Sequence, residues 1–357
     1  MLKITDSMKH LQARANNFLR ELLAQVSIID IQSVEPESIP EMHGFDITRV
    51  TVSGCPWTLV CSVMASGQPR HVRTALLQLR NHIAHQGSNV IPILIAPYLS
   101  PEAQTMCREQ LVGHLDLEGN VRITFGGIFI ERLVANKPAV ERRELKSLFK
   151  PKSALVLRMM LRDPSRAWRV AELADVTGVS LGHISNVRAG LLDREWAQIS
   201  NNGLFLSEPD ALLDAWRNVY ESPLGKRMCF YTPLHGSALE TAAREGVKMS
   251  EGRAVFASFS AANWLAPYGR VGTQYFYAND EGVKTLQTSL QLSPVSKGEN
   301  IVVIVPKDDG VFKDTIEPAH DAICTSLVQT YLDLINTGER GEEAAQHLRQ
   351  EKLTWIK

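Results

Sequence analysis

The chain has 357 residues and a formal net charge of −1 at pH 7, and this length favours two or three domains that each bury a core. The near-zero charge excludes a protein that binds polyanions over its whole surface, so any affinity for nucleic acid must come from a local basic patch. Its five scattered cysteines argue against a disulfide framework or a zinc site, and the lack of a long apolar stretch predicts a cytoplasmic protein that contacts no membrane.

The first domain is expected to span residues 1–143, where helical and strand patterns alternate. Ser100 and Pro101 supply an N-cap and a proline at the first position of one of its helices. Apolar spacing predicts helices at residues 8–26, 72–83 and 101–112. Strands are predicted at residues 27–34, 45–52, 57–64 and 90–96, around Leu115, and at residues 121–130. This order indicates a mixed α/β sheet.

The element order, with the segments at residues 92–101 and 114–120, resembles the restriction-endonuclease-like domains at the front of some helix-turn-helix proteins. In active members an acidic residue and a Glu-x-Lys pair on the next strand hold a divalent metal ion. Asp46 stands in the place of the first acid, whereas Cys61 and Val63 stand where the carboxylate and the lysine should be. Magnesium needs oxygen ligands, so we predict an inactive domain with no metal, no cofactor and no catalytic residue.

Asp116 and Asn120 offer a second pair of polar side chains in this domain. They could replace the missing metal ligands. A solvent-facing turn that caps the last strand explains them more simply, because aspartate and asparagine favour turns. We therefore place the turn ahead of the metal site.

A boundary between domains is expected after residue 143, where residues 136–138 read Asn-Lys-Pro and residues 141–146 are highly charged. A helix at residues 153–161 follows, with Leu155, Val156, Met159 and Met160 facing inward. Asp163 is the single acid in a basic run of Lys150, Lys152, Arg158, Arg162, Arg166 and Arg169. The run predicts a basic surface beside the next motif; the alternative is an ordinary solvated helix face.

Residues 144–208 have the pattern of a winged helix-turn-helix. A short strand is expected at residues 167–170, and the helix that follows ends at Gly178, which can adopt a left-handed conformation. Ser180 is a suitable N-cap for a second helix at residues 181–192. The inward residues are predicted to be Val170, Leu173, Ala174 and Val176 in the first helix and Ile184, Val187 and Leu191 in the second.

The opposite face of the second helix carries small and polar side chains that suit close approach to base edges. Asn186 can pair with adenine, and His183 and Arg188 can reach phosphate or guanine. Two short strands around residues 201–203 (Asn-Asn-Gly) predict the wing. The predicted DNA-binding residues are Arg166, Arg169, Ser180, Gly182, His183, Ser185, Asn186, Arg188, Asn201 and Asn202. The alternative is a helix-turn-helix that makes only protein contacts.

Residues 209–357 are expected to form an α/β domain, with strands near residues 228–231, 273–278 and 301–305. Its helices are predicted at residues 236–245, 258–265 and 326–335. The segments Phe-Ser-Ala-Ala-Asn-Trp at 259–264, Tyr-Leu-Asp-Leu at 331–334 and Glu-Arg-Gly-Glu-Glu-Ala-Ala at 339–345 resemble AbiEi-type antitoxins of type IV toxin–antitoxin systems.

The resemblance implies a nucleotidyltransferase-like fold for the last domain and repression of the chain's own operon through the winged helix. A working nucleotidyltransferase has Gly-Ser followed by two close aspartates. No such pair follows Ser237, and Asp308 and Asp309 stand apart in an expected surface turn, so we predict no catalysis. Arg340, Glu342 and Glu343 either pair within helix ends or contact a partner protein.

Together these patterns predict an α/β protein of three domains, residues 1–143, 144–208 and 209–357. The predicted function is that of a DNA-binding transcriptional regulator of the type IV antitoxin kind, not an enzyme. Its expected partners are double-stranded DNA, a cognate toxin protein and a second copy of the chain on DNA. The rival hypotheses are a DNA-processing nuclease targeted by the winged helix and a pure protein-interaction scaffold.

Overall fold

The fold is taken from a computed structural model that describes residues 2–36, 45–84, 86–134, 138–223, 225–269 and 272–355. Asn136 and Lys137, which mark part of the expected boundary, lie outside these ranges. The chain divides into two compact units. The first consists of residues 1–143 and 191–195, and the second of residues 144–190 and 196–357. Each is described by itself.

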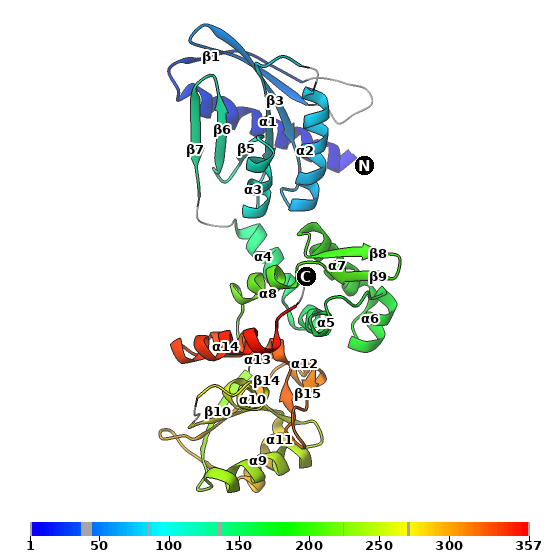
Figure 1. Cartoon of the computed structure of the whole chain (residues 1–357), viewed down its shortest axis with the longest axis vertical. Coiled ribbons are helices and arrows are strands. Elements are labelled where there is room, and N and C mark those ends of the chain that lie inside the picture. The colour runs from blue at the N-terminus through cyan, green and yellow to red at the C-terminus, as the bar shows by residue number, and fades with distance from the viewer. Residues whose placement is uncertain are drawn as a thin grey trace. The chain divides into compact units, whose positions relative to one another are not determined.

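The first unit is built on a seven-stranded sheet in which the strands follow chain order from β1 to β7 (Figure 1). The strands are β1 (Ile29–Pro36), β2 (Asp46–Val52), β3 (Cys55–Val63), β4 (Val90–Ala96), β5 (Gly113–Asp116), β6 (Val121–Phe125) and β7 (Ile128–Arg132). The β3–β4 and β4–β5 pairs are parallel and the other neighbours are antiparallel. The two central pairs are parallel because helices connect them.

Helices cover both faces of this sheet. Side chains of α1 (Leu2–Ala24) pack with one face in a core that includes Leu19, Leu23, Leu59 and Ile93. Side chains of α2 (Pro69–Ile83) and α3 (Pro101–Glu109) pack with the other face around Val60, Leu76, Leu94 and Cys107. The Ser100 hydroxyl accepts a hydrogen bond from the Ala103 amide (3.2 Å), which confirms the predicted N-cap.

One strand was predicted too long. Residues 121–130 form two strands, β6 and β7, which turn back on each other at Gly126 and Gly127. Both glycines have positive φ, 55° and 78°, a backbone conformation that residues with a side chain rarely adopt. A tight hairpin therefore replaces the single expected strand.

The second unit begins with the segment predicted to be a winged helix-turn-helix, called the winged module below. It contains α5 (Pro151–Arg162), α6 (Val170–Thr177), β8 (Ala197–Ser200) and β9 (Gly203–Leu206), together with α4 (Ala139–Leu148), which starts in the first unit, and α7 (Leu181–Asp193), whose last three residues belong to the first unit. Gly178 ends α6 at φ 67°, as predicted. Two expectations were wrong. Val176 is 52% exposed while Thr177 is buried, and residues 167–170 supply a single β-bridge from Trp168 to Leu204.

The rest of the second unit is an α/β domain whose mixed sheet has the order β13-β10-β14-β12-β11-β16-β15. Its strands are β10 (Gly225–Tyr231), β11 (Ala254–Phe256), β12 (Gln274–Ala278), β13 (Ser293–Pro294), β14 (Ile301–Pro306), β15 (Thr315–Ile316) and β16 (Cys324–Thr325). Its helices are α8 (Pro209–Arg217), α9 (Gly236–Met249), α10 (Ser258–Leu265), α11 (Asp280–Ser289), α12 (Gly310–Lys313), α13 (Leu327–Ile335) and α14 (Glu339–Lys352). Helices α13 and α14 lie on one side of the sheet, and α9 and α11 on the other (Figure 1).

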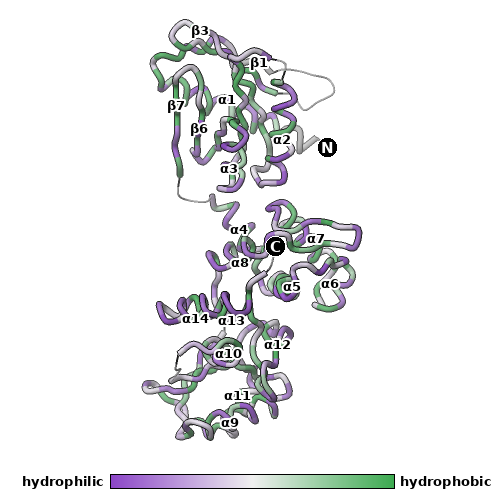
Figure 2. Tube along the Cα trace, viewed as in Figure 1, coloured by the Kyte–Doolittle hydropathy of each residue, from purple (hydrophilic) through white to green (hydrophobic). Residues whose placement is uncertain are grey.

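Hydropathy follows this layering. Figure 2 shows α14 largely in the hydrophilic colour, in keeping with the exposed glutamates of its first turns. Only its inner residues, such as Ala344, Ala345 and Leu348, are buried. Among the described residues, no helix has both the length and the apolar character needed to cross a membrane.

Candidate nucleic-acid interface

Helix α7 is oriented by the side chains that it buries. Ile184, Val187 and Leu191 are each at most 3% exposed, at the predicted spacing of three and four residues. The backbone amides of His183 and Ile184 donate to the Ser180 carbonyl, which closes the first turn. The opposite face of the helix must therefore point to solvent.

That outward face holds most of the residues expected to read bases. Ser180, Gly182, Ser185 and Asn186 are all exposed. A Cβ built on Gly182 would meet no atom within 4 Å, so the packing of the described chain does not require a glycine there. Leu181, which the sequence interpretation passed over, is 57% exposed beside these residues. Its place at the first helical position, next to polar residues, was a signal that could have identified it.

The two flanking candidates on α7 lie differently. His183 is half-buried, and its Nε2 lies 2.9 Å from the hydroxyl oxygen of Ser153 on α5. This contact turns the imidazole toward α5, so His183 links α7 to α5. Arg188 is also half-buried on the flank of α7.

The predicted wing is a short hairpin with two exposed asparagines at its tip, Asn201 and Asn202. The Ser200 hydroxyl accepts a hydrogen bond from the backbone amide of Asn202 (3.2 Å). Gly203 follows at φ 141°, where a Cβ would lie 2.4 Å from the Trp168 carbonyl oxygen. The hairpin strands carry no lysine or arginine, so the wing offers hydrogen bonds more than charge.

The basic run does not form one surface, which corrects the sequence interpretation. Arg158 is only 4% exposed. Its Nε donates to Asp314 (3.1 Å), its Nη1 to the Gln329 side chain (2.9 Å) and its Nη2 to the Gly310 carbonyl (3.0 Å). Three hydrogen bonds from one guanidinium satisfy a buried charge, so Arg158 ties α5 to the C-terminal domain and is not available to phosphate.

The other arginines of the run divide between two surroundings. Arg162 pairs with Asp314 and donates to the Thr315 carbonyl (2.9 Å), so it too faces the C-terminal domain. Arg166 lies 3.7 Å over the Trp168 ring and pairs with Glu172. Arg169 is exposed at the N-cap of α6. Of these, Arg169 is the best placed to meet a phosphate.

A buried polar network continues from Arg158 into the C-terminal domain. The Asp333 carboxylate accepts from the hydroxyl groups of Tyr220 (2.5 Å) and Tyr277 (3.1 Å) and from the Gln329 amide (2.9 Å). Burial raises the pKa of Asp333 to about 6, although these hydrogen bonds and the charge of Arg158 oppose the shift. In the sequence, Asp333 stands out only as part of the Tyr-Leu-Asp-Leu segment at residues 331–334.

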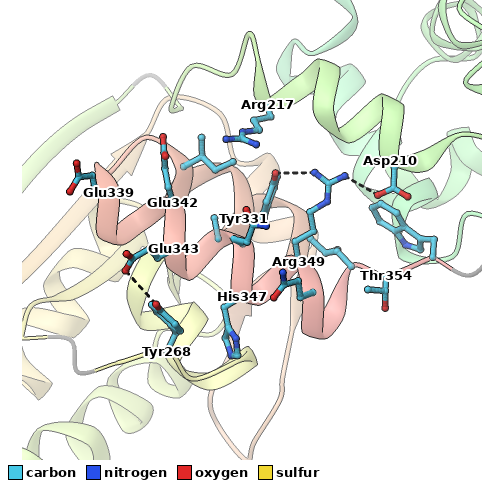
Figure 3. A pocket seen from close by; sticks show the side chains of 16 residues that line it. Asp210, Arg217, Tyr268, Tyr331, Glu339, Glu342, Glu343, His347, Arg349 and Thr354 are labelled. Atoms are coloured by element: carbon cyan, nitrogen blue, oxygen red, sulfur yellow. Dashed lines mark hydrogen bonds and ion pairs between the residues drawn. The ribbon is translucent and has the colours of Figure 1, made fainter.

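A second polar contact joins α8 to α14 beside a groove of about 1040 Å³ (Figure 3). Arg349 of α14 donates to Asp210 (2.8 Å) and to Asp214 (2.5 Å) of α8 and reaches the Tyr331 hydroxyl (3.3 Å). Because α8 follows directly from β9, this arginine fixes the helix through which the chain passes from the winged module into the C-terminal domain.

The acidic residues expected at the start of α14 line the same groove. The Glu343 carboxylate accepts from the Tyr268 hydroxyl (3.3 Å), and Glu342 and Glu339 lie at one end of it (Figure 3). Arg340 is exposed. Both interpretations of these residues, helix-end pairing and partner contact, remain predictions.

In the first unit, the expected acid of the nuclease-like domain is buried. Asp46 pairs in register with Cys61 and accepts from the Asn16 amide (3.1 Å). Burial raises the pKa of Asp46, and burial also raises the pKa of the Cys61 thiol, with the nearby charge of Asp46 adding to it. A carboxyl group that resists ionisation beside an uncharged thiol is a poor pair of ligands for a hard cation.

Asp116 and Asn120 form a turn, but it is not solvent-facing as expected. Asp116 is fully buried and accepts from the amides of Leu99 (3.1 Å), Glu118 (3.1 Å) and Asn120 (2.9 Å) and from the Asn120 side chain (2.8 Å). Asn120 accepts in turn from the Val134 amide (2.7 Å). The carboxylate is used to hold the loops at the end of the sheet together.

One cluster of suitable atoms for a metal ion occurs among the described residues, at Glu317, His320 and Asp321. Asp321 pairs with Lys248 (3.1 Å), and its amide donates to the Glu317 carboxylate (2.8 Å). These contacts explain the cluster as a surface ion-pair group.

Comparison with known proteins gives a family match over part of the chain. Residues 205–354 match the model of a family described as "Transcriptional regulator, AbiEi antitoxin, Type IV TA system". The match begins in β9 and includes Tyr220, Tyr277, Asp314, Gln329 and Asp333, which surround or extend from buried Arg158. Searches of curated proteins and of solved structures found no match. Residues 205–354 of this chain are therefore similar to the matching region of AbiEi-family transcriptional regulators, the antitoxins of type IV systems.

Proposed function

We propose that the chain is a DNA-binding transcriptional regulator of the type IV antitoxin kind that represses its own operon through the winged helix-turn-helix. The observation that carries the proposal is the outward face of α7, where Ser185 and Asn186 are exposed and Gly182 is not required by internal packing. Small residues let a helix approach base edges closely, and asparagine can pair with adenine. The family of the C-terminal region supports the same function.

The test is binding of the full chain to duplexes that tile the DNA upstream of its own gene. Fluorescence anisotropy at about 50 and about 200 mM salt separates specific from non-specific affinity, since phosphate contacts weaken steeply with salt. We expect one duplex to retain binding at the higher salt while a scrambled duplex of equal composition loses it. No binding to any duplex at low salt would favour the protein-interaction scaffold. Equal affinity for all duplexes would contradict sequence-specific repression.

We further propose that the chain acts as a pair on DNA. A single winged helix covers one half-site, and two copies related by a two-fold axis would read an inverted repeat. The matching duplex should then bind two chains with a Hill coefficient above one, and a duplex with one half-site should bind one. A cognate toxin is the second expected partner, because the family is described as an antitoxin family.

The rival nuclease hypothesis receives a separate test. We propose that the first unit does not cut DNA, because Asp46 lies buried beside Cys61. The purified chain should leave supercoiled and linear duplex intact in magnesium and in manganese. Cleavage that disappears in Asp46→Asn would instead establish the nuclease.

A further inference from the structure

A cavity of about 470 Å³ lies within the second unit, where the winged module meets the C-terminal domain. Its walls come from the end of α4, the first turns of α5, the end of α8 with the segment that follows it, the loop after β14, and single residues of α12 and α13. This volume falls in the range of small-molecule sites. Neither the family description nor the DNA-binding face of α7 accounts for it.

One side of the cavity is apolar and flat. The rings of Phe149 and Trp216 stack with centroids 5.2 Å apart and planes 8° from parallel. Val219 and Val311 extend this wall, and Trp216 is almost wholly buried. Because Trp216 is only 2% exposed, it supports Phe149 from behind, and the half-buried Phe149 ring offers the surface on which a ring system can lie.

The charged side chains of the lining carry a small positive excess. Lys146, Lys150, Arg158 and Lys307 line the cavity with Glu221 and Asp308. Because Arg158 is neutralised by Asp314 and Lys146 by Glu221, the excess is one positive charge. Lys146 pairs with Glu221 (2.5 Å), whereas Lys150 and Lys307 are exposed and have no ion-pair partner among the residues that the structure describes. Pro151 and Ala154 bring the positive end of the α5 dipole to the same space.

We propose that this cavity binds a small amphipathic anion, a molecule with an apolar ring system and one or two acidic groups. The rings lie against Phe149, which Trp216 holds in place, and the acidic group is placed near Lys150 and Lys307. Burial of the rings supplies the affinity, and the two lysines select for negative charge. The site does not depend on the proposed DNA binding, so it is tested without DNA.

The probe is 8-anilinonaphthalene-1-sulfonate, which combines an apolar ring system with one sulfonate. Its fluorescence is titrated with the full chain and with the double variant Lys150→Glu/Lys307→Glu. Both side chains are exposed, and a glutamate at the N-cap of α5 is compatible with the helix dipole, so folding should persist. We expect one saturable site whose dissociation constant rises roughly tenfold or more in the double variant.

Three controls decide the outcome. Lys284→Glu/Lys297→Glu makes the same change of charge on exposed lysines that do not line the cavity, and it should leave the dissociation constant unchanged. N-phenyl-1-naphthylamine, the uncharged analogue of the probe, should bind more weakly. Its dissociation constant should not change in the Lys150→Glu/Lys307→Glu variant. Ala154→Leu, which narrows the cavity, should weaken both probes while thermal unfolding stays cooperative.

The proposal is overturned if the Lys150→Glu/Lys307→Glu chain binds the sulfonate probe as tightly as the unmodified chain. It is also overturned if the probe binds without saturation, or if the neutral analogue binds equally well. In those cases the cavity is a packing void within the second unit and does not select an anion.

Discussion

Asn186 lies exposed on the outward face of α7, next to Ser185. If this amide pairs with an adenine, Asn186→Ala should weaken the specific duplex by about 1 to 3 kcal/mol and leave the scrambled duplex nearly unchanged. Anisotropy titrations on the two duplexes measure the difference. Asn202→Ala at the wing tip is the matched control and should weaken both duplexes alike. An equal loss on both duplexes for Asn186→Ala would mean that α7 does not read bases.

His114 of β5 is 1% exposed, and neither ring nitrogen has a hydrogen-bond partner among the described residues. Burial lowers the pKa of His114 to about 4, with the charges of Arg108 and Arg122 adding to the shift and Glu131 opposing it. The unfolded chain binds this proton near pH 6.5, whereas the folded chain resists it. The contribution of His114 to the free energy of unfolding is therefore greatest above pH 6.5 and falls as the pH drops toward 4.

Urea unfolding of the full chain at several pH values tests this. Between pH 6.5 and 4, a single group of this kind removes up to about 1.4 kcal/mol per pH unit. His114→Leu puts an apolar side chain of similar size at the buried position of His114. It should flatten the dependence of the free energy of unfolding on pH between 6.5 and 4. His320, which is exposed, supplies the control variant His320→Leu, and its profile should match that of the unmodified chain. A His114→Leu profile as steep as the original would place the pH dependence elsewhere.

At the scale of elements, Arg169 and Arg162 are a useful pair, because one faces solvent at the start of α6 and the other pairs with Asp314. Arg169→Ala should weaken binding to every duplex and lower the slope of log K against log salt by about one unit. Arg162→Ala should leave that slope unchanged. The measurement is the salt dependence of anisotropy titrations. If only Arg162→Ala changes the slope, the phosphate-binding side has been assigned to the wrong face.

Elements with a strong local signal were predicted well. Strand β4 (Val90–Ala96) and helix α10 (Ser258–Leu265) have the expected bounds, since a continuous apolar strand and a helix of small apolar residues need no distant partner to be identified. The short strands β15 (Thr315–Ile316) and β16 (Cys324–Thr325) were missed. Two residues carry no periodicity, and these strands exist only because a neighbouring strand pairs with them.

The candidate site divides in the same way. Ile184, Val187 and Leu191 orient α7 through spacing alone, so its outward face could be predicted. Arg158 could not be placed, because the partners Asp314 and Gln329 lie more than 150 residues later in the chain. Its spacing of three and four residues from buried Leu155, Ala154 and Leu161 was the available signal that it lies on the inner face of α5.

At the scale of the molecule, the winged module and the C-terminal domain act as one packed body. Arg158 carries a guanidinium from α5 into a polar network that ends at Asp333, and Arg349 attaches α14 to α8. Buried polar groups are stable only when each has its partners, so the two parts favour one mutual arrangement. Any change in the C-terminal domain that moves Asp314 or Gln329 should therefore also shift α5. Helix α5 supports α7 through the contact between Ser153 and His183.

This coupling predicts which part of the molecule Arg158 stabilises. Arg158→Ala leaves Asp314 with Arg162 alone and leaves Gln329 and the Gly310 carbonyl without that donor. Removing one partner of a buried ion pair costs about 3 to 5 kcal/mol, so in calorimetry the transition of the second unit should move to a markedly lower temperature. The transition of the first unit, identified by its response to His114→Leu, should stay in place. Arg166→Ala removes an exposed pair with Glu172 and the contact over the Trp168 ring, and should cost about 1 to 2 kcal/mol. If Arg158→Ala is no more harmful than Arg166→Ala, the network does not hold the winged module to the C-terminal domain, and the module must be held by apolar packing such as that of Phe149 on Trp216.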